Sequence, residues 1–253
     1  MKELAKSVVR KLLSKRGLDL TRIGEKKGDQ PVFHYIAAAE VVSASEREGL
    51  SVCDYVENLW GQQGDTQRVI DRMASCGVFE VEQPVVLEIG PGTGRYLEKI
   101  LTKRKPTRYE IYEVARDWAE WLQSRYPVVL HEADGASLKQ TAADSVNLLH
   151  AHGVFVQLPF LVAYRYWMEM WRVVSNNGWV VFDIYSEDCM DEPTVEKWLA
   201  SKHNYPYFLS RNYVVSLFEN HGFSLKGAFT NKHGEGRSEY LVFLRNYAAE
   251  VKA

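Results

Sequence analysis

The hydrophobic pattern of the sequence changes at about residue 80. Before this point, apolar residues recur at helical spacing over residues 2–15 and again over residues 35–73. Residues 61–64 interrupt the second pattern, and Asp65 is placed to cap the helix that follows. We therefore expect residues 1–80 to form a mostly helical N-terminal cap.

After residue 80, short apolar runs alternate with helical stretches. Seven runs have the length of a strand and lie at residues 85–89, 108–112, 128–131, 145–150, 179–185, 224–229 and 239–245. Strands that alternate with helices form a parallel sheet with right-handed crossovers, whereas the last two runs are close enough to form a hairpin. The sequence thus predicts an α/β fold over residues 81–253. We expect a doubly wound, mostly parallel seven-stranded sheet with an antiparallel C-terminal edge hairpin.

Two connecting segments carry further signals. Residues 160–174 have a helical pattern, which Asn176-Asn177-Gly178 should stop before the fifth strand. Residues 186–209 form an insertion rich in aromatic residues between the fifth strand and the next helix. We expect this insertion to lie on the substrate side and to act as a lid together with the cap. Packing in the core is the alternative for each of its aromatic side chains.

Composition and charge narrow the functional class. The 253 residues are 46% hydrophobic and 25% charged, with a formal net charge of -2, which is typical of a globular protein. Such a charge gives no global positive field, so we expect no nucleic-acid partner. The three cysteines lack C-x-x-C spacing and are odd in number, which favours a reducing, cytoplasmic location. No apolar run has the character of a signal peptide or of a transmembrane segment.

The first 30 residues differ from the rest because they carry nine Lys or Arg against four acids. Two interpretations stay open for the basic amphipathic helix predicted at residues 2–15. It packs on the body of the protein with its charged face in solvent, or it makes peripheral contact with an anionic membrane surface or partner.

A glycine-rich loop follows the first predicted strand. Glu88 precedes three glycines, Gly90, Gly92 and Gly94, and such loops let a ligand approach the backbone at the crevice outside the strand ends. The third glycine falls two residues after the second, whereas the dinucleotide fingerprint needs three. A carboxylate about 4 Å from a phosphate charge would cost roughly 4 kcal/mol, and beside a sulfonium or an ammonium it would gain a similar amount. The loop therefore favours a positively charged ligand.

The sequence VLEIGPGTG at residues 86–94 resembles the first motif of the class I S-adenosylmethionine-dependent methyltransferases. Later segments are similar to this family in the same order, and the resemblance spans residues 84–245. It implies methyl transfer as the activity and S-adenosylmethionine as the cofactor. Gln157 and Asn147 depart from the family pattern, in which a histidine and an aspartate are common, and this affects local contacts.

The resemblance also implies which residues bind the cofactor. Glu113 ends the second strand, where the family has an acid that binds both ribose hydroxyls. Asp134 and Gly135 lie in the segment that faces the adenine edge, although Asp-Gly is also a common turn signal. Ala151 is the second residue of the segment His150 to Pro159, which is similar to the family motif after the fourth strand. The expected cofactor-binding residues are Glu88, Gly90, Gly92, Gly94, Glu113, Asp134, Gly135 and Ala151.

A hydroxyl acceptor must lose a proton when it is methylated, and a histidine suits that task at neutral pH. His152 is the candidate base because it follows the fourth strand at the crevice; the alternative is that it shapes the pocket without titrating. Tyr185, Ser186 and Glu187 follow the fifth strand and should flank the acceptor. We see no magnesium site, because the fourth strand ends in His150-Ala151-His152 rather than in an acid.

The expected acceptor is a small molecule, methylated on an oxygen. The motif after the fourth strand lacks the Asn/Asp-Pro-Pro-aromatic pattern of family members that methylate nucleobase amines, and residues 16–23 weakly resemble leaders of glycan-assembly enzymes. A sugar or glycan hydroxyl is therefore favoured. Two other hypotheses stay open: a non-catalytic binding protein with this fold, and a nicotinamide-dependent oxidoreductase. The oligomeric state is not indicated by the sequence.

Overall fold

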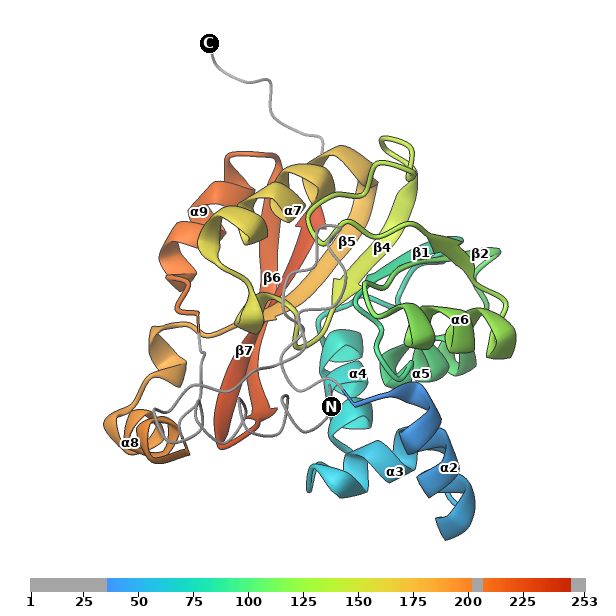
Figure 1. The fold of residues 1–253 in the computed structure, drawn as a ribbon. Coiled ribbons are helices and arrows are strands. Elements are labelled where there is room, and N and C mark those ends of the chain that lie inside the picture. The colour runs from blue at the N-terminus through green and yellow to red at the C-terminus, as the bar shows by residue number, and fades with distance from the viewer. Residues whose placement is uncertain (1–35, 202–206, 247–253) are drawn as a thin grey trace, which may run out of the picture. The chain divides into compact units, whose positions relative to one another are not determined.

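The computed structural model describes residues 36–201 and 207–246. Within these residues, seven strands form one sheet in the order β3-β2-β1-β4-β5-β7-β6 (Figure 1). Their bounds are β1 (Val85–Ile89), β2 (Arg108–Tyr112), β3 (Val129–His131), β4 (Val146–Ala151), β5 (Val174–Ile184), β6 (Phe223–His233) and β7 (Gly236–Arg245). The first five strands pair in parallel, and β7 pairs antiparallel with both β5 and β6. The predicted seven-stranded sheet with an antiparallel hairpin is confirmed.

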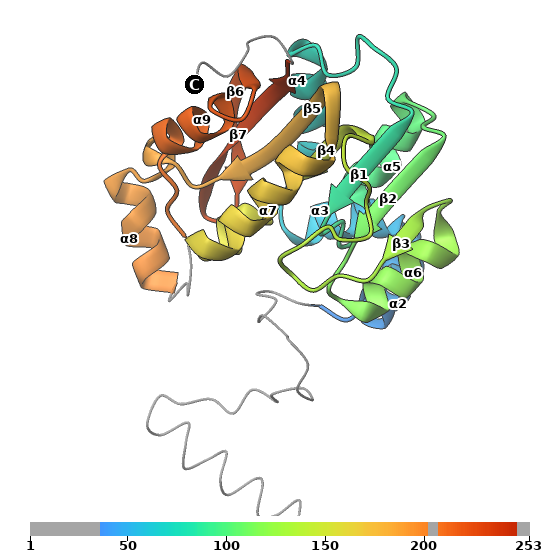
Figure 2. The ribbon, with the colours of Figure 1, turned by 90° about the horizontal axis from the view of Figure 1, so that it is seen from above.

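The strand order reverses beside β1. The chain runs outward from β1 to β2 and β3, then returns to place β4 on the other side of β1. Figure 2 shows the outcome, with β2 and β3 on one side of β1 and with β6 and β7 at the opposite side of the sheet. A reversal of this kind opens a crevice at the carboxyl ends of the two central strands, where open α/β sheets bind their ligands.

Helices cover both faces of the sheet. Those described are α2 (Ala38–Glu48), α3 (Val52–Leu59), α4 (Asp65–Ser75), α5 (Arg95–Lys103), α6 (Arg116–Arg125), α7 (Phe160–Val173), α8 (Glu192–Ser201) and α9 (Arg211–Glu219). The short 3-10 turns η1 (Phe155–Gln157) and η2 (Glu187–Cys189) follow β4 and β5. Buried side chains of α7 and α9 pack on one face, and those of α4, α5 and α6 pack on the other.

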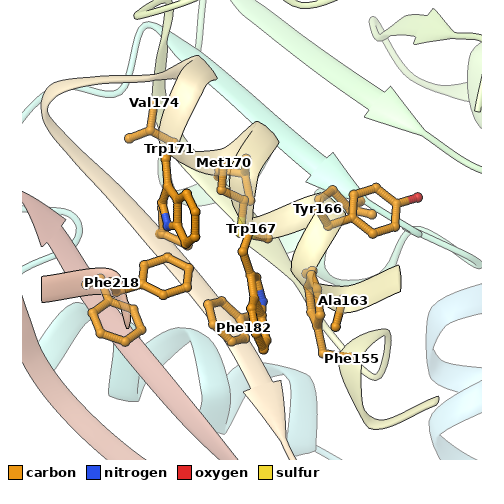
Figure 3. Packing of buried hydrophobic residues seen from close by; sticks show 14 of the residues in the cluster. Phe155, Ala163, Tyr166, Trp167, Met170, Trp171, Val174, Phe182 and Phe218 are labelled. Carbon is orange, nitrogen blue, oxygen red and sulfur yellow. The ribbon is translucent and has the colours of Figure 1, made fainter. Parts of the chain in front are cut away.

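The face under α7 and α9 is a dense aromatic core (Figure 3). Phe182 of β5 lies at its centre, with ring centroids 5.0 Å from Phe155, 5.4 Å from Phe218 and 6.3 Å from Trp167. Phe182 and Trp167 are fully buried. Each such ring removes a large apolar area from water, so this core supplies much of the stability of the sheet.

The face under α4 and α5 begins as an apolar core and becomes polar toward the carboxyl ends of the strands. Val86, Leu148 and Val181 are fully buried there against the helices. Further along the same face of their strands lie Glu88 and His150, which are also buried and which are paired in register. The polar end of this face coincides with the crevice between β1 and β4.

The start of α4 differs from the sequence prediction. Asp65 is the first residue of the helix and not its cap; Gly64 holds the capping position with a left-handed φ of 74° and no side-chain cap. The carboxylate of Glu57 accepts hydrogen bonds from the N–H groups of Gly64 and Thr66 instead, and Asp65 pairs with Arg68. The prediction was wrong by one residue, because a distant acid satisfies the free N–H groups.

The predicted turn at residues 176–178 is also different. Helix α7 ends at Val173, and β5 begins at the next residue, so that these residues lie within the strand. Val174 already pairs with Val146, whereas the next pair is Trp179 with Leu148, so the register shifts between the two pairs. Asn177, with a φ of 59°, lies in this irregular stretch of β5. The hairpin is longer than expected, because β6 and β7 pair as far as His233 and Gly236.

The described residues all fall in one compact unit, which contains helices α2 to α4 as well as the sheet. The rest of the predicted cap, including the basic helix at residues 2–15, lies outside the described residues, as does part of the insertion at residues 186–209. The described part of that insertion contains the turn η2 and helix α8. In the described ranges, no helix has both the length and the apolar character needed to span a membrane.

Candidate functional site

The glycine loop after β1 is held closely at two of its glycines and is open at the third. All three have left-handed φ values: 63° at Gly90, 53° at Gly92 and 77° at Gly94. A Cβ on Gly90 would lie 2.8 Å from Val154, and one on Gly94 would lie 2.7 Å from Leu122. A Cβ on Gly92 would meet nothing within 4 Å. The loop is therefore packed against the protein on both sides and exposes backbone at Gly92, as a ligand-binding loop must.

Glu113 ties the end of β2 to this loop. One of its carboxylate oxygens accepts a hydrogen bond of 2.8 Å from the N–H of Gly92, and the other accepts one of 2.8 Å from the N–H of Ala115. The side chain is buried, and this desolvation raises the pKa of Glu113 although the two hydrogen bonds oppose the change. Each oxygen keeps a second lone pair, so the carboxylate can also accept from two ligand hydroxyls.

Glu88 is buried behind the loop, with 1% of its surface exposed. The hydroxyl of Tyr109 donates to its Oε2 atom at 2.8 Å. Desolvation raises the pKa of Glu88 to about 8, the bond from Tyr109 and the charge of Arg95 lower it, and Glu113 raises it. Among the described residues, the charge of Arg95 does not offset this burial, and the ring of His150, 3.9 Å from Oε1, is neutral because desolvation lowers its pKa. A positively charged ligand would supply a cationic partner.

Asp134 and Gly135 form the turn after β3. Asp134 accepts hydrogen bonds from the N–H groups of Ala136 and Ser137 and from the hydroxyl of Ser137. Partial desolvation acts to raise the pKa of Asp134, but these hydrogen bonds hold it at about 2. The carboxylate is therefore ionised and 44% exposed at the crevice side of the sheet. Its predicted contact with adenine stays a prediction.

The loop after β4 is held by a residue that the sequence prediction did not use. Ala151 ends β4, and Gly153, two residues later, donates its N–H to Asp183 of β5 at 2.7 Å. Asp183 is fully buried, and desolvation raises its pKa to about 6. The available signal was an acid inside an otherwise apolar strand, which is costly unless it has a local partner.

His152, the predicted base, is in contact with protein groups at both ring nitrogens. Its Nε2 atom lies 3.0 Å from Nδ1 of His150, and its Nδ1 atom lies 3.3 Å from the hydroxyl of Tyr240. The ring also stacks on Tyr96, with centroids 3.4 Å apart and planes 8° apart. Desolvation lowers the pKa of His152 well below its ordinary value, so the ring is neutral at pH 7. To act as a base, His152 must exchange one of these contacts for the acceptor.

The residues after β5 divide into two groups. The hydroxyl of Tyr185 lies 2.6 Å from Nδ1 of His233 in β6, and a Cβ on Gly153 would lie 3.4 Å from the other nitrogen of that histidine. Tyr185 therefore faces the loop after β4. Glu187 does not, because its carboxylate accepts from the hydroxyl of Ser210 and the N–H of Arg211 at the start of α9.

An open groove of about 500 Å³ lies between the start of α4, helix α8 and the β6–β7 hairpin. Its lining is mainly polar and includes Thr194, Thr230, Asn231 and Lys197. Lys232 also lines it and donates to the carbonyl of Gly61 at 3.1 Å. Across the described ranges, no group of three or more His, Cys, Asp or Glu side chains is arranged to hold a metal ion.

No family model matches the sequence, and no curated protein matches it. Solved structures do match. The magnesium protoporphyrin IX methyltransferase of Synechocystis, solved with bound S-adenosylhomocysteine, has a TM-score of 0.56 at 13% identity, over 95% of this chain and all of its own. A putative sarcosine dimethylglycine methyltransferase of Galdieria sulphuraria also has 0.56, at 11% identity over 73% and 86%. An N-methyltransferase of Bradyrhizobium japonicum, again with S-adenosylhomocysteine, has 0.52, at 13% over 71% and 86%.

These similarities define the fold. The chain has the fold of the class I S-adenosylmethionine-dependent methyltransferases, with the same mixed sheet of seven strands.

Proposed function

We propose that the protein is a methyltransferase that binds S-adenosylmethionine and methylates an oxygen of a small acceptor. One observation carries the proposal: a glycine loop open at Gly92 lies between two buried carboxyl groups, Glu88 and Glu113. The neighbours in the fold that were solved with S-adenosylhomocysteine support the choice of cofactor.

The residues present fit this cofactor. The open backbone at Gly92 accommodates the ligand, Glu113 offers two acceptors to the ribose hydroxyls, and Asp134 and Gly135 are available to the adenine. Glu88 fits the positive end of the cofactor, because its ionised form has no strong partner in the free protein. Gly90, Gly94 and Ala151 hold the backbone around the ligand.

The bound cofactor supplies an activated methyl group on a sulfonium. What remains for the protein is to orient the acceptor, to exclude water and to take up a proton. His152 lies at the end of β4 for this last task, and Tyr185 and Asp183 shape the loop beside it.

The acceptor is proposed to be a sugar or glycan hydroxyl. The polar groove between α4, α8 and the hairpin offers threonine, asparagine and lysine side chains as hydrogen-bond partners for a hydroxyl-rich molecule, although none of the proposed cofactor-binding residues lines it. The described cysteines, Cys53, Cys76 and Cys189, are free, which supports a reducing location. A tritiated-methyl transfer screen over sugars, phenols and acids would identify the acceptor class.

Cofactor binding is tested by thermal unfolding with S-adenosylhomocysteine. A concentration a hundredfold above Kd should stabilise the fold by about 2.7 kcal/mol and raise Tm by roughly 5–10 °C. Glu113→Ala should abolish most of this shift, because the ribose loses both acceptor oxygens. Glu120→Ala is the matched control: this acid is exposed on α6 and pairs only with Arg116 in the described contacts.

An unchanged melting curve of the wild type at millimolar ligand would refute the proposal. A shift produced by reduced nicotinamide dinucleotide instead would assign the site to an oxidoreductase. Binding without methyl transfer to any acceptor would assign the fold to a non-catalytic binding protein.

A further inference from the structure

Three buried side chains and the half-buried His152 connect the loop after β4 with the carboxyl group behind the glycine loop. We call Glu88, Tyr109, His150 and His152 the polar network. Nε2 of His152 lies 3.0 Å from Nδ1 of His150, and Nε2 of His150 lies 2.9 Å from the hydroxyl of Tyr109. That hydroxyl lies 2.8 Å from Oε2 of Glu88. Three consecutive hydrogen-bond distances thus link the loop after β4 to His150 of β4, Tyr109 of β2 and Glu88 of β1, the strand that lies between β2 and β4.

The network has two consistent arrangements of its protons. When Glu88 is ionised, Tyr109 donates to it, and each histidine donates through its Nε2–H toward Glu88. When Glu88 carries a proton, every donor points the other way, and both histidines carry the hydrogen on Nδ1. The second arrangement contains one proton more than the first. In each hydrogen bond of the network, the proton has moved from the donor atom to the acceptor atom.

The burial of the network favours these arrangements over any with a charged histidine. Desolvation lowers the pKa of His150 to about 3 and that of His152 well below its ordinary value, so both rings stay neutral. The groups that face Glu88 are Tyr109, Glu113, Arg95 and the neutral ring of His150, whose Nδ1 atom lies 3.9 Å from Oε1 of Glu88. Burial and the charges around it raise the pKa of Glu88 to about 8. Glu88 is therefore the member of the network that can keep a proton at neutral pH.

We propose that the polar network is a proton relay, which carries the proton released by the acceptor hydroxyl from His152 to Glu88. The inference rests on the proposed function, since it needs a hydroxyl acceptor and a sulfonium donor. The contact between His152 and Tyr240 is the longest of the histidine contacts, at 3.3 Å, and it is the one that the acceptor replaces. Tyr109 and His150 do not touch the acceptor; they act through His152.

The step balances in atoms and charge. The acceptor oxygen forms a bond to the methyl carbon, and the carbon–sulfur bond breaks with its electron pair left on sulfur. The acceptor proton passes to Nδ1 of His152, whose Nε2 proton passes to His150. The Nε2 proton of His150 passes to Tyr109, and the hydroxyl proton of Tyr109 passes to Glu88. A sulfonium and a carboxylate become a thioether and a carboxylic acid, so no charge remains in the buried site.

The relay predicts a signal that needs no acceptor. S-adenosylmethionine and S-adenosylhomocysteine share an α-ammonium group, and only S-adenosylmethionine adds the sulfonium charge, which the relay requires near Glu88 to ionise it. In protein with ¹⁵N-labelled histidine at pH 7, two-bond proton–nitrogen spectra should show His150 and His152 as Nδ1–H tautomers alone and with S-adenosylhomocysteine. Both should switch to the Nε2–H tautomer with S-adenosylmethionine, and Glu88→Gln should give one spectrum with either ligand.

Tyr109→Phe removes the hydroxyl that links His150 to Glu88, so the switch should be lost. Tyr112→Phe is the matched control, because this tyrosine lies in the same strand and bonds to Thr141. The relay is wrong if both ligands raise Tm but the tautomers do not change, if only one histidine switches, or if Tyr109→Phe still switches. If neither ligand raises Tm, the proposed function itself has failed. If Tyr109→Phe does not fold, Glu88→Gln is the second test: a tautomer switch that persists in Glu88→Gln would overturn the relay.

Discussion

On the face of the sheet under α7 and α9, the strands present apolar side chains along their length, with Phe182 at the centre of a cluster of rings. On the face under α4 and α5, the same strands change from valine and leucine to Glu88, His150 and Asp183 at their carboxyl ends. Burial of ionisable groups costs several kcal/mol per charge, so a fold selected only for stability would not contain the second arrangement. The face under α7 and α9 therefore stabilises the fold, and the polar end of the face under α4 and α5 is the candidate functional site.

We expect the largest change in stability from a substitution in the aromatic core under α7 and α9. Phe182→Ala should lower the free energy of unfolding by about 3–5 kcal/mol, because it removes a fully buried ring between other rings. Urea unfolding measures the loss. Leu161→Ala on the same helix layer is the control; its side chain is 71% exposed and should change stability by less than about 0.5 kcal/mol. Equal losses for the two variants would contradict the assignment of this face to stability.

Substitutions at two glycines of the loop should affect different quantities, the stability of the fold and the affinity for the ligand. Gly94→Ala should lower stability by about 1–3 kcal/mol, because its Cβ would meet Leu122 at 2.7 Å. Gly92→Ala should cost only about 1 kcal/mol for its positive φ, yet weaken S-adenosylhomocysteine at least tenfold, because its Cβ enters the open space above the loop. Urea unfolding and calorimetric titration of both variants give the two quantities. Unchanged affinity in Gly92→Ala would place the ligand elsewhere.

The smallest effect concerns pH. The pKa of Glu88 is about 8 in the folded protein, above the ordinary value of 4.5, so the folded state holds an extra proton between these values. Stability should therefore fall as pH rises through this window, and from pH 7 to 8 the loss should be about 1 kcal/mol. Asp183 has a pKa of about 6, so its effect on the pH dependence of stability lies mainly below pH 7. Glu88→Gln should flatten the profile from pH 7 to 8; an equal slope in both proteins would exclude Glu88 as its source.

Features that depend on local pattern were predicted from the sequence. The positions of the glycine loop and of Glu113 after the first two strands follow from residue spacing and from the alternation of strands and helices; the structure adds the hydrogen bond between Glu113 and Gly92. The sheet with its antiparallel hairpin was predicted as well, because short apolar runs indicate strands wherever turns separate them. The cap of α4 was misplaced, because the acid that satisfies its N–H groups comes from the preceding helix.

Features that depend on the register between strands were not predicted. Tyr240 contacts His152 across 88 positions of sequence, and Tyr109 reaches Glu88 and His150 from a neighbouring strand. In the sequence these tyrosines are part of apolar strand runs and have no distinguishing mark. The pairing of β1 with β2 and β4 places Tyr109, and the pairing of β5 with β4 and β7 places Tyr240.

The position of β7 has a consequence for synthesis of the protein. Although it is the last described strand, it lies inside the sheet between β5 and β6 and carries Tyr240 to the crevice. A nascent polypeptide that has emerged only as far as β6 exposes the unpaired edge of β5, which is a template for aggregation. Completion of the site therefore requires β7 to leave the ribosome, and a truncation before Gly236 removes a strand from the interior of the sheet.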